Sequence, residues 1–348
     1  MNGESEIVAR TLGRAGRLTL NRPRALNALS TGMCQSVIDA LLQWRNDPAV
    51  QFVLLDHEGP RGFCAGGDIR VVSESGAGDG KLARGFFMAE YRMNELMFRY
   101  SKPIVVAMDG VTMGGGVGIS MPGRYRIATE RTLWAMPEGD IGFFPDVGEG
   151  WYLPRLPGHV GTWLGLTGAR LKAADLMELG IATHYVESAK LAELKEQLVS
   201  SDASLDSLLA PFKASPGSPP INAMREMIEK IYALPTVEKI IEALAASPNA
   251  DAQAEYHVLL RKCPASLKVT QRLLLRCPRR FIDNMVDEYR IAIRMVSRPD
   301  FREGVRAILI DKDNKPKWSP AKLAEVTEDM LDAIFAPLPP DEEWTPVV

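Results

Sequence analysis

Short apolar runs of strand length recur through the first half of the chain. Residues 50–55 (VQFVLL) and 103–108 (PIVVAM) are nearly continuous apolar stretches, typical of parallel strands that are buried on both faces. Residues 15–21, 126–129 and 183–186 predict further strands because they are bounded by turn-forming or polar residues.

Between these runs, apolar residues recur at the three- and four-residue spacing of a helix. Ser30, a favourable N-cap residue, precedes one such segment, which ends near Pro48. Residues 84–100 form another amphipathic helix. Strands that alternate with helices predict an α/β fold with parallel strand pairing, and we expect this core over residues 1–190.

Beyond residue 190 the strand patterns fade and helical spacing dominates. Residues 214–220 (ASPGSPP) are rich in Ser and Pro and predict a linker or exposed loop. The clearest helical segments that follow are residues 224–234, 237–244 and 264–275. We therefore expect residues 191–348 to form a helical C-terminal region.

Composition and charge argue against nucleic acid as a partner and against a membrane-spanning segment. The 348 residues are 46% hydrophobic and 24% charged, which is ordinary for a globular protein with a sizeable core. The net charge is −3 and no Lys/Arg run is present, so nucleic acid is not expected as a partner. No stretch approaches the roughly 20 apolar residues of a membrane span, so we expect no membrane segment.

Cysteine and histidine usage predicts neither disulfides nor a metal site. The four cysteines lack CxxC spacing and are expected to be reduced thiols in a cytoplasmic compartment. The acidic residues 1–8 have neither an apolar signal core nor the Arg-rich character of a transit peptide. With four histidines and no HExxH motif, no metal is expected.

Two glycine-rich turns each follow a predicted strand. Gly66 and Gly67 come after the strand at 50–55, and Gly114 to Gly116 come after the strand at 103–108. Two such turns could each direct one N–H at a single oxygen, which is the arrangement of an oxyanion hole. The alternative is that both are tight turns that permit close helix packing.

Three acidic residues are candidates for chemistry, and each has a structural alternative. Glu138 has apolar flanks, which would raise its pKa toward that of a general base; the alternative is a surface acid. Asp146 begins an Asp-x-x-Glu pattern, so it could merely cap the next helix. Glu90 lies beside an apolar helical stripe and could simply pair with a core arginine.

Taken together, several segments resemble the crotonase (enoyl-CoA hydratase/isomerase) superfamily. They are residues 21–29 (NRPRALNAL), 63–68 (FCAGGD), 109–116 (DGVTMGGG) and 136–142 (MPEGDIG). The resemblance implies a crotonase-like spiral of ββα units with a helical region that often supports trimers. It also implies that the amides of Gly67 and Gly115 bind a thioester oxygen and that residues 22–26 lie near the nucleotide end of coenzyme A.

Other segments indicate a branch within that superfamily. Hydratases carry a second glutamate where this chain has Gly118, and a glycine where it has Asp146. The chain instead resembles the 3-hydroxyisobutyryl-CoA hydrolases at residues 144–148, 152–155, 167–171, 300–306, 310–313 and 316–318. This resemblance implies hydrolysis of a short 3-hydroxyacyl-CoA, either 3-hydroxyisobutyryl-CoA or 3-hydroxypropionyl-CoA.

The same resemblance assigns roles to named residues. Glu90, Gly115, Glu138 and Asp146 would contact the substrate, with Glu90 lining the acyl pocket. Glu138 would either activate water or attack the thioester to form an anhydride. Asp146 would hold the 3-hydroxyl group and assist proton transfer. No metal or prosthetic group is implied, because coenzyme A arrives as part of the substrate.

Two other functions are kept as alternatives. One is an enoyl-CoA hydratase or isomerase on the same fold. The other is a non-catalytic crotonase-fold protein that binds a ligand such as RNA; Glu138, both glycine turns and the absence of a basic patch argue against it. A homo-oligomer is compatible with the resemblance, and the sequence leaves the assembly state open.

Overall fold

The computed structural model describes residues 5–348, so the first four residues of the acidic N-terminal segment lie outside the described chain. The chain forms two compact units, and each is assembled from three separate segments. The first unit comprises residues up to 67, 92–134 and 170–220, and the second comprises 68–91, 135–169 and 221–348. The expected boundary near residue 190 stays a prediction.

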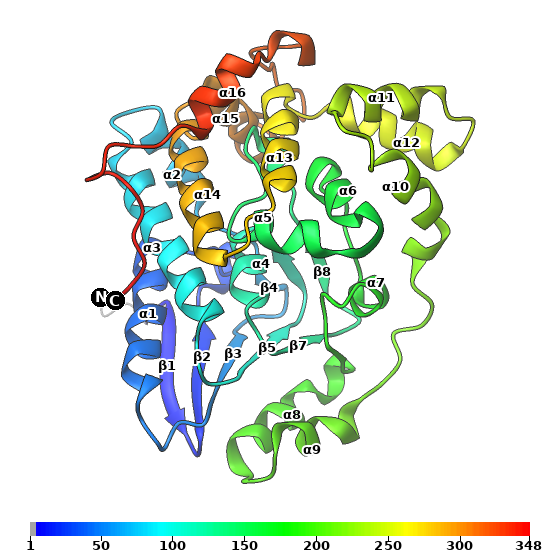
Figure 1. The fold of residues 1–348 in the computed structure, drawn as a ribbon. Helices are drawn as coiled ribbons and strands as arrows, with labels where there is room; N and C mark the ends of the chain where they lie inside the picture. Colours follow the sequence, from blue (N-terminus) through cyan, green and yellow to red (C-terminus); the bar gives the residue numbers. More distant parts are fainter. Residues whose placement is uncertain (1–4) are drawn as a thin grey trace. The chain divides into compact units, whose positions relative to one another are not determined.

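A six-stranded sheet forms the core of the first unit (Figure 1). In sheet order its strands are β1 (Ile7–Leu12), β2 (Ala15–Leu20), β3 (Phe52–His57), β5 (Ile104–Met108), β7 (Tyr125–Ala128) and β9 (His184–Tyr185). All neighbours pair in parallel except β1 and β2, which form an antiparallel hairpin. The five predicted strands and their parallel pairing are confirmed, whereas β1 was not predicted.

A second, three-stranded sheet was also not predicted. Its strands are β4 (Gly62–Cys64), β6 (Val111–Met113) and β8 (Leu133–Ala135), in that order. Each has three residues, which is too short to show the alternation of a strand in sequence. This small sheet carries the two glycine turns.

The large sheet of the first unit packs against helices α1 (Thr31–Arg45), α7 (Ala173–Glu178), α8 (Ser188–Ser200) and α9 (Leu205–Leu209). The unit also contains α4 (Gly115–Ser120), which packs on the small sheet, and the end of α3 (Lys81–Phe98), with 3₁₀ turns at Pro23–Ala25 and Ala210–Phe212. Ser30 caps α1 as predicted, its Oγ accepting the Met33 N–H at 3.2 Å. Leucines of α8 and α9 pack on one sheet face against alternate residues such as Phe52 and Leu54. That packing buries the apolar residues on this face of the strands.

The second unit is built almost entirely of helices. They are α2 (Ile69–Gly76), the start of α3, α5 (Glu149–Tyr152), α6 (Val160–Thr167), α10 (Arg225–Ile231), α11 (Val237–Ala246), α12 (Ala250–Leu259), α13 (Pro264–Arg276), α14 (Phe281–Met295), α15 (Pro299–Val305) and α16 (Glu328–Phe335). Shorter turns are η2 (Glu138–Ile141), η3 (Leu153–Arg155), η4 (Pro157–His159), η6 (Pro220–Ala223), the π-helix η7 (Arg306–Ile310) and η8 (Leu323–Glu325). β9 is the last strand of the described chain, so the helical C-terminal region is confirmed. In the part of the chain that the structure describes, no helix has the length and apolarity needed to cross a membrane.

Candidate active site

The first unit brings the two glycine turns together. β4 and β6 pair in parallel, so the turns that follow them leave the small sheet at the same edge. A Cβ placed on Gly66 would lie 3.6 Å from the amide nitrogen of Gly115. A Cβ on Gly116 would lie only 2.2 Å from the carbonyl oxygen of Cys64, so glycine is required there.

The amides of Gly67 and Gly115 are candidate hydrogen-bond donors to a ligand. Gly115 is the first residue of α4, where an N–H has no acceptor within its own helix. Within residues 5–348, neither of these two amides donates a hydrogen bond to the main chain. The pair thus has the donors of an oxyanion hole, and its binding of a thioester oxygen stays a prediction.

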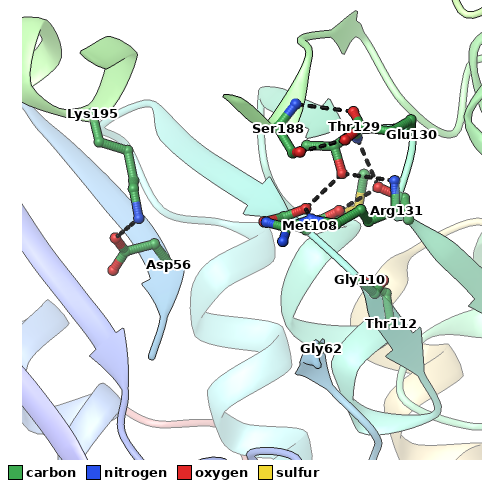
Figure 2. A network of polar contacts seen from close by, with 12 residues as sticks. Asp56, Gly62, Met108, Gly110, Thr112, Thr129, Glu130, Arg131, Ser188 and Lys195 are labelled. Atoms are coloured by element: carbon green, nitrogen blue, oxygen red, sulfur yellow. Dashed lines mark hydrogen bonds and ion pairs between the residues drawn. The ribbon is translucent and has the colours of Figure 1, made fainter. Parts of the chain in front are cut away.

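A polar network holds the strand ends that lead into the second glycine turn. Asp109 accepts hydrogen bonds from the Thr129 hydroxyl at 2.6 Å and from Nε of Arg131 at 2.9 Å. Thr132 donates from its hydroxyl to the carbonyl of Met108. Figure 2 shows Met108, Thr129 and Arg131 of this network close together. These contacts fix the backbone just before the glycines.

A second polar network lies in the other unit and consists of buried acids. Its five members are each less than one-tenth exposed: Glu90, Glu138, Asp146, Glu149 and Glu288. Burial without a full set of partners disfavours the ionised form and raises the pKa of an acid. All five have a pKa above the ordinary value, and burial is the largest cause in each case. We call these residues the acid cluster.

Asp146 is held by a tyrosine and does not cap a helix. The hydroxyl of Tyr91 donates to Oδ2 of Asp146 at 2.6 Å. Helix α5 begins at Glu149 with Gly148 as its N-cap and with no side-chain cap, so the capping alternative is wrong. Burial raises the pKa of Asp146 to about 7, although the Tyr91 hydrogen bond opposes the rise.

Glu138 is buried at the start of η2, so the alternative of a surface acid is wrong. Burial, and next the charge of Asp146, raise the pKa of Glu138 well above its usual range, as its apolar flanks predicted. Its Oε2 has no hydrogen-bond partner in the described chain. The nearby Phe143 stacks on Phe87 at 5.5 Å and lies 5.2 Å from Phe301, measured between ring centroids. These rings keep the surroundings of η2 apolar.

Glu90 does not pair with an arginine, so that structural alternative is also wrong. The charged groups that act on Glu90 are acids. Burial is the largest cause that raises the pKa of Glu90 well above the usual range, and the charges of Asp146 and Glu288 raise it further. The apolar stripe beside it on α3, which includes Phe87 and Met93, is buried as predicted.

Sequence reasoning missed three polar members of this site: Tyr91, Glu149 and Glu288. Glu288 accepts hydrogen bonds from the amides of Gly148 at 2.8 Å and Gly150 at 3.0 Å. A signal was present for Glu288, because it interrupts the buried apolar face of α14 at helical spacing. Tyr91 gave no signal, because its partner lies 55 residues further along the chain.

The late segment at residues 300–306 supports the turn that carries Glu138. A Cβ on Gly304 would lie 2.4 Å from the carbonyl carbon of Ile141, and one on Gly142 would lie 2.5 Å from the carbonyl oxygen of Asp300. The fully buried Asp300 in turn accepts from Arg298 at 3.1 Å and from the Ser319 amide at 2.7 Å. α15 and η2 therefore pack backbone to backbone.

The acid cluster is suited to proton transfer near neutral pH. A carboxyl group with a pKa near 7 can both take and return a proton at that pH, and Asp146 meets this condition. Glu138, once ionised, is a stronger base or nucleophile than an ordinary carboxylate because its pKa is raised. Perturbed acids in one cluster are typical of catalytic sites. Among residues 5–348, no group of three or more His, Cys, Asp or Glu side chains is arranged to hold a metal ion.

Comparison with known proteins identifies relatives over nearly the full chain. A sequence model described as enoyl-CoA hydratase/isomerase matches residues 15–335. The protein named "3-hydroxyisobutyryl-CoA hydrolase, mitochondrial" from Xenopus laevis is 44% identical, covering 94% of this chain and 87% of its own length. The protein of the same name from Homo sapiens is 42% identical, covering 96% of this chain and 89% of its own length.

Two solved structures share the fold closely. One is titled a carnitinyl-CoA dehydratase from Mycobacterium thermoresistibile, with a TM-score of 0.93 and 39% identity over 98% of this chain and 99% of that one. The other is titled an enoyl-CoA hydratase from Rhodobacter sphaeroides 2.4.1, with a TM-score of 0.90 and 38% identity over 98% of this chain and 100% of that one. The predicted crotonase fold is therefore confirmed.

The names of the relatives contradict the predicted cytoplasmic location. Both curated relatives are named mitochondrial. The prediction rested on Cys34, Cys64, Cys263 and Cys277, which indeed form no disulfide in the described chain. Reduced thiols distinguish a reducing from an oxidising compartment, but they do not distinguish two reducing compartments from each other.

Proposed function

Because the chain belongs to the enoyl-CoA hydratase/isomerase family, we propose that it hydrolyses the thioester of 3-hydroxyisobutyryl-CoA to the free hydroxy acid and coenzyme A, as in valine degradation. The observation that carries the proposal is the similarity to relatives named for this reaction, at more than 40% identity and at nearly full length. We propose 3-hydroxypropionyl-CoA as an alternative substrate, because it differs from 3-hydroxyisobutyryl-CoA only by the absence of one methyl group. The proposal includes assembly as a homo-oligomer, which light scattering would test.

We assign the thioester carbonyl oxygen to the amides of Gly67 and Gly115. Nucleophilic attack on a thioester moves negative charge onto that oxygen, and two fixed N–H donors stabilise the charge without reorganisation. Loss of one such donor typically lowers the rate by about 10² to 10³. The absence of main-chain acceptors for both amides in residues 5–348 supports this assignment.

We assign the chemical step to Glu138. In one route its carboxylate takes a proton from water while the water oxygen attacks the carbonyl carbon; the C–S bond then breaks and the thiolate receives the proton. In the other route Glu138 itself attacks, coenzyme A leaves as the thiolate, and water hydrolyses the resulting anhydride. Asp146 would accept the hydrogen of the 3-hydroxyl group, and Glu90 would line the acyl pocket. Hydroxylamine attacks the glutamyl carbonyl of an anhydride to give a hydroxamate at Glu138 and the free hydroxy acid, whereas the water route leaves Glu138 unmodified, so mass spectrometry of this residue distinguishes the routes.

The competing function is hydration or dehydration, which the titles of both similar structures name. In that chemistry two glutamates act on water and on the substrate carbon, and this chain has Gly118 in place of one of them. Gly118 lies on the buried helix α4 and has no side chain, so no second carboxylate is present at that position. This difference favours hydrolysis.

The deciding experiment measures two products with the purified protein. Thiol released from 3-hydroxyisobutyryl-CoA is followed with a chromogenic disulfide, and hydration of crotonyl-CoA is followed by loss of its enone absorbance. We expect thiol release with saturation and negligible hydration. Hydration without thiol release would reject the hydrolase, and neither activity with retained coenzyme A binding would favour a binding protein.

The first prediction concerns Glu138→Gln. The amide is close in size but cannot take a proton or form an anhydride, so we expect kcat to fall by about 10² to 10⁴. Binding of coenzyme A, measured by calorimetry, should change little. The control is Glu226→Gln at an exposed position of α10, which should leave kcat unchanged. Equal kcat in Glu138→Gln and the wild type would reject the assignment.

The second prediction concerns metals. The proposed steps use only carboxyl and amide groups of the chain, so we propose that no metal or prosthetic group is needed. Thiol release should therefore be unchanged after exhaustive dialysis against a chelator. Loss of activity that a divalent cation restores would contradict this part of the proposal.

A further inference from the structure

We propose that Glu288 is a positioning residue for the reaction: it fixes the loop that presents Asp146. This inference rests on the proposed function. The side chain is fully buried on α14, and its two carboxylate oxygens accept from different amides of one loop. Oε2 accepts from Gly148 at 2.8 Å, and Oε1 accepts from Gly150 at 3.0 Å. A carboxylate that binds two neighbouring amides fixes their relative orientation.

The loop needs such a partner because its backbone is strained. Val147 has φ +56°, a left-handed conformation that β-branched residues rarely adopt, and Gly148 follows with φ +100°. A conformation of this kind persists only when its surroundings determine it. Asp146 immediately precedes these two residues, so relaxation of the loop would turn its carboxylate away from the Tyr91 hydroxyl.

Glu288 is itself held in place. The side-chain amide of Asn284, one turn earlier on α14, donates to Oε1 at 2.7 Å. A Cβ on Gly150 would lie 2.3 Å from Oδ1 of Asn284, so α14 and α5 approach as closely as glycine allows. Three donors on one buried carboxylate form a defined binding site for the loop that carries Asp146.

The test compares Glu288→Gln with Asp287→Asn. The carboxamide retains one acceptor oxygen but places an NH₂ group against the second loop amide, so one of the two hydrogen bonds is lost. Asp287 is the preceding residue of α14 and pairs with Arg276 at 3.1 Å, and no loop amide contacts it. The matched control thus makes the same change, from a carboxyl group to an amide, on the same helix.

Two readouts separate this inference from the proposed function. The first is amide hydrogen exchange in the peptide covering residues 144–152, which does not depend on activity. We expect exchange there to rise about tenfold or more in Glu288→Gln and to stay at the wild-type rate in Asp287→Asn. Unchanged exchange in Glu288→Gln would overturn the inference, whatever the enzyme hydrolyses.

The second readout is the kinetics of thiol release. We expect Glu288→Gln to lower kcat by about 10- to 100-fold with KM within about threefold, because the acid that aligns the substrate is displaced. A kcat within twofold of the wild type would overturn the positioning role. An inactive wild type would refute the proposed function, and the exchange experiment would still decide whether Glu288 holds the loop.

A second variant covers the case in which Glu288→Gln does not fold. Val147→Gly removes the unfavourable φ and frees the loop without touching Glu288. We expect faster exchange in residues 144–152 and a kcat that falls at least tenfold. Wild-type kinetics together with faster exchange would show that loop order is irrelevant to the reaction, and would overturn the inference.

Discussion

Asp146 receives a single side-chain hydrogen bond, from Tyr91, in surroundings dominated by other acids. That bond favours the ionised form of Asp146 and lowers its pKa, while burial raises it to about 7. The balance between these two effects places the titration of Asp146 at neutral pH. Tyr91, fully buried, therefore controls when the neighbouring acid is charged.

The third prediction follows for Tyr91→Phe. Removing the donor should raise the pKa of Asp146 above 7 and move the corresponding limb of the kcat/KM profile to higher pH. A rise of one pKa unit, about 1.4 kcal/mol, would lower the ionised fraction of Asp146 and hence kcat/KM at pH 7 about fivefold. Tyr100→Phe is the control, since that hydroxyl donates to the Leu41 carbonyl and contacts none of the acids. A profile that does not move in Tyr91→Phe would refute this role.

The local sequence predicted which acids are buried better than it predicted their hydrogen-bond partners. The apolar flanks of Glu138 correctly predicted a raised pKa, because desolvation depends on neighbours in the chain as well as in space. The capping pattern at Asp146 was misleading, because Gly148 takes the N-cap position instead. The partner Tyr91 is 55 residues away, and no pattern of local spacing contains that information.

At the scale of elements, backbone contacts between α15 and η2 determine where Glu138 lies. Gly304 and Gly142 permit this approach, since side chains at either position would meet main-chain atoms. The motif at residues 300–306 is thus explained by packing. It lies outside the acid cluster and supports the turn that begins with Glu138.

The fourth prediction is that Gly304→Ala will impair both stability and activity. Its Cβ would lie 2.4 Å from the carbonyl carbon of Ile141, so η2 must shift. Overpacking of this kind typically costs about 1–3 kcal/mol, and we expect a lower urea midpoint together with a reduced kcat. Gly85→Ala on α3 is the control, because the new methyl group would enter open space and should stabilise by about 0.4–1 kcal/mol. A Gly304→Ala enzyme as active and as stable as the wild type would contradict this account of η2.

Element length decided which parts of the fold could be predicted. Runs of five or six apolar residues identified β3 and β5 correctly, since such strands are buried on both faces. β4, β6 and β8 have three residues each and were missed, because alternation needs a longer segment. The glycine turns were recognised, but the small sheet that brings them together was not.

At the scale of the whole molecule, the acid cluster links stability to pH. Each of its members has a folded-state pKa above the unfolded value, so the folded chain binds more protons than the unfolded chain between those values. Stability is therefore highest below about pH 4, as far as these groups alone are concerned, and it is lost as the pH rises through the folded-state pKa values. For Asp146 and Glu288 that loss extends to about pH 7 and about pH 8.

The fifth prediction isolates one contributor, Glu149. Both of its carboxylate oxygens lack hydrogen-bond partners in the described chain, and burial followed by the charge of Glu288 raises its pKa well above the usual range. Glu149→Gln cannot ionise, so its free energy of unfolding should exceed that of the wild type increasingly as the pH rises above about 4.5. Urea unfolding at pH 5 and pH 8 measures this difference. A constant difference between the two pH values would show that Glu149 does not titrate in this range.

The order in which the loop and its partner appear in the chain has a consequence for synthesis. Gly148 and Glu288 are 140 residues apart, and the two units interleave so that no single cut isolates either one. At about 5–20 residues per second, a ribosome adds α14 roughly 7 to 28 s after it adds the loop. For that interval the nascent chain lacks the carboxylate that secures the strained turn, so the catalytic geometry can be completed only near the end of translation.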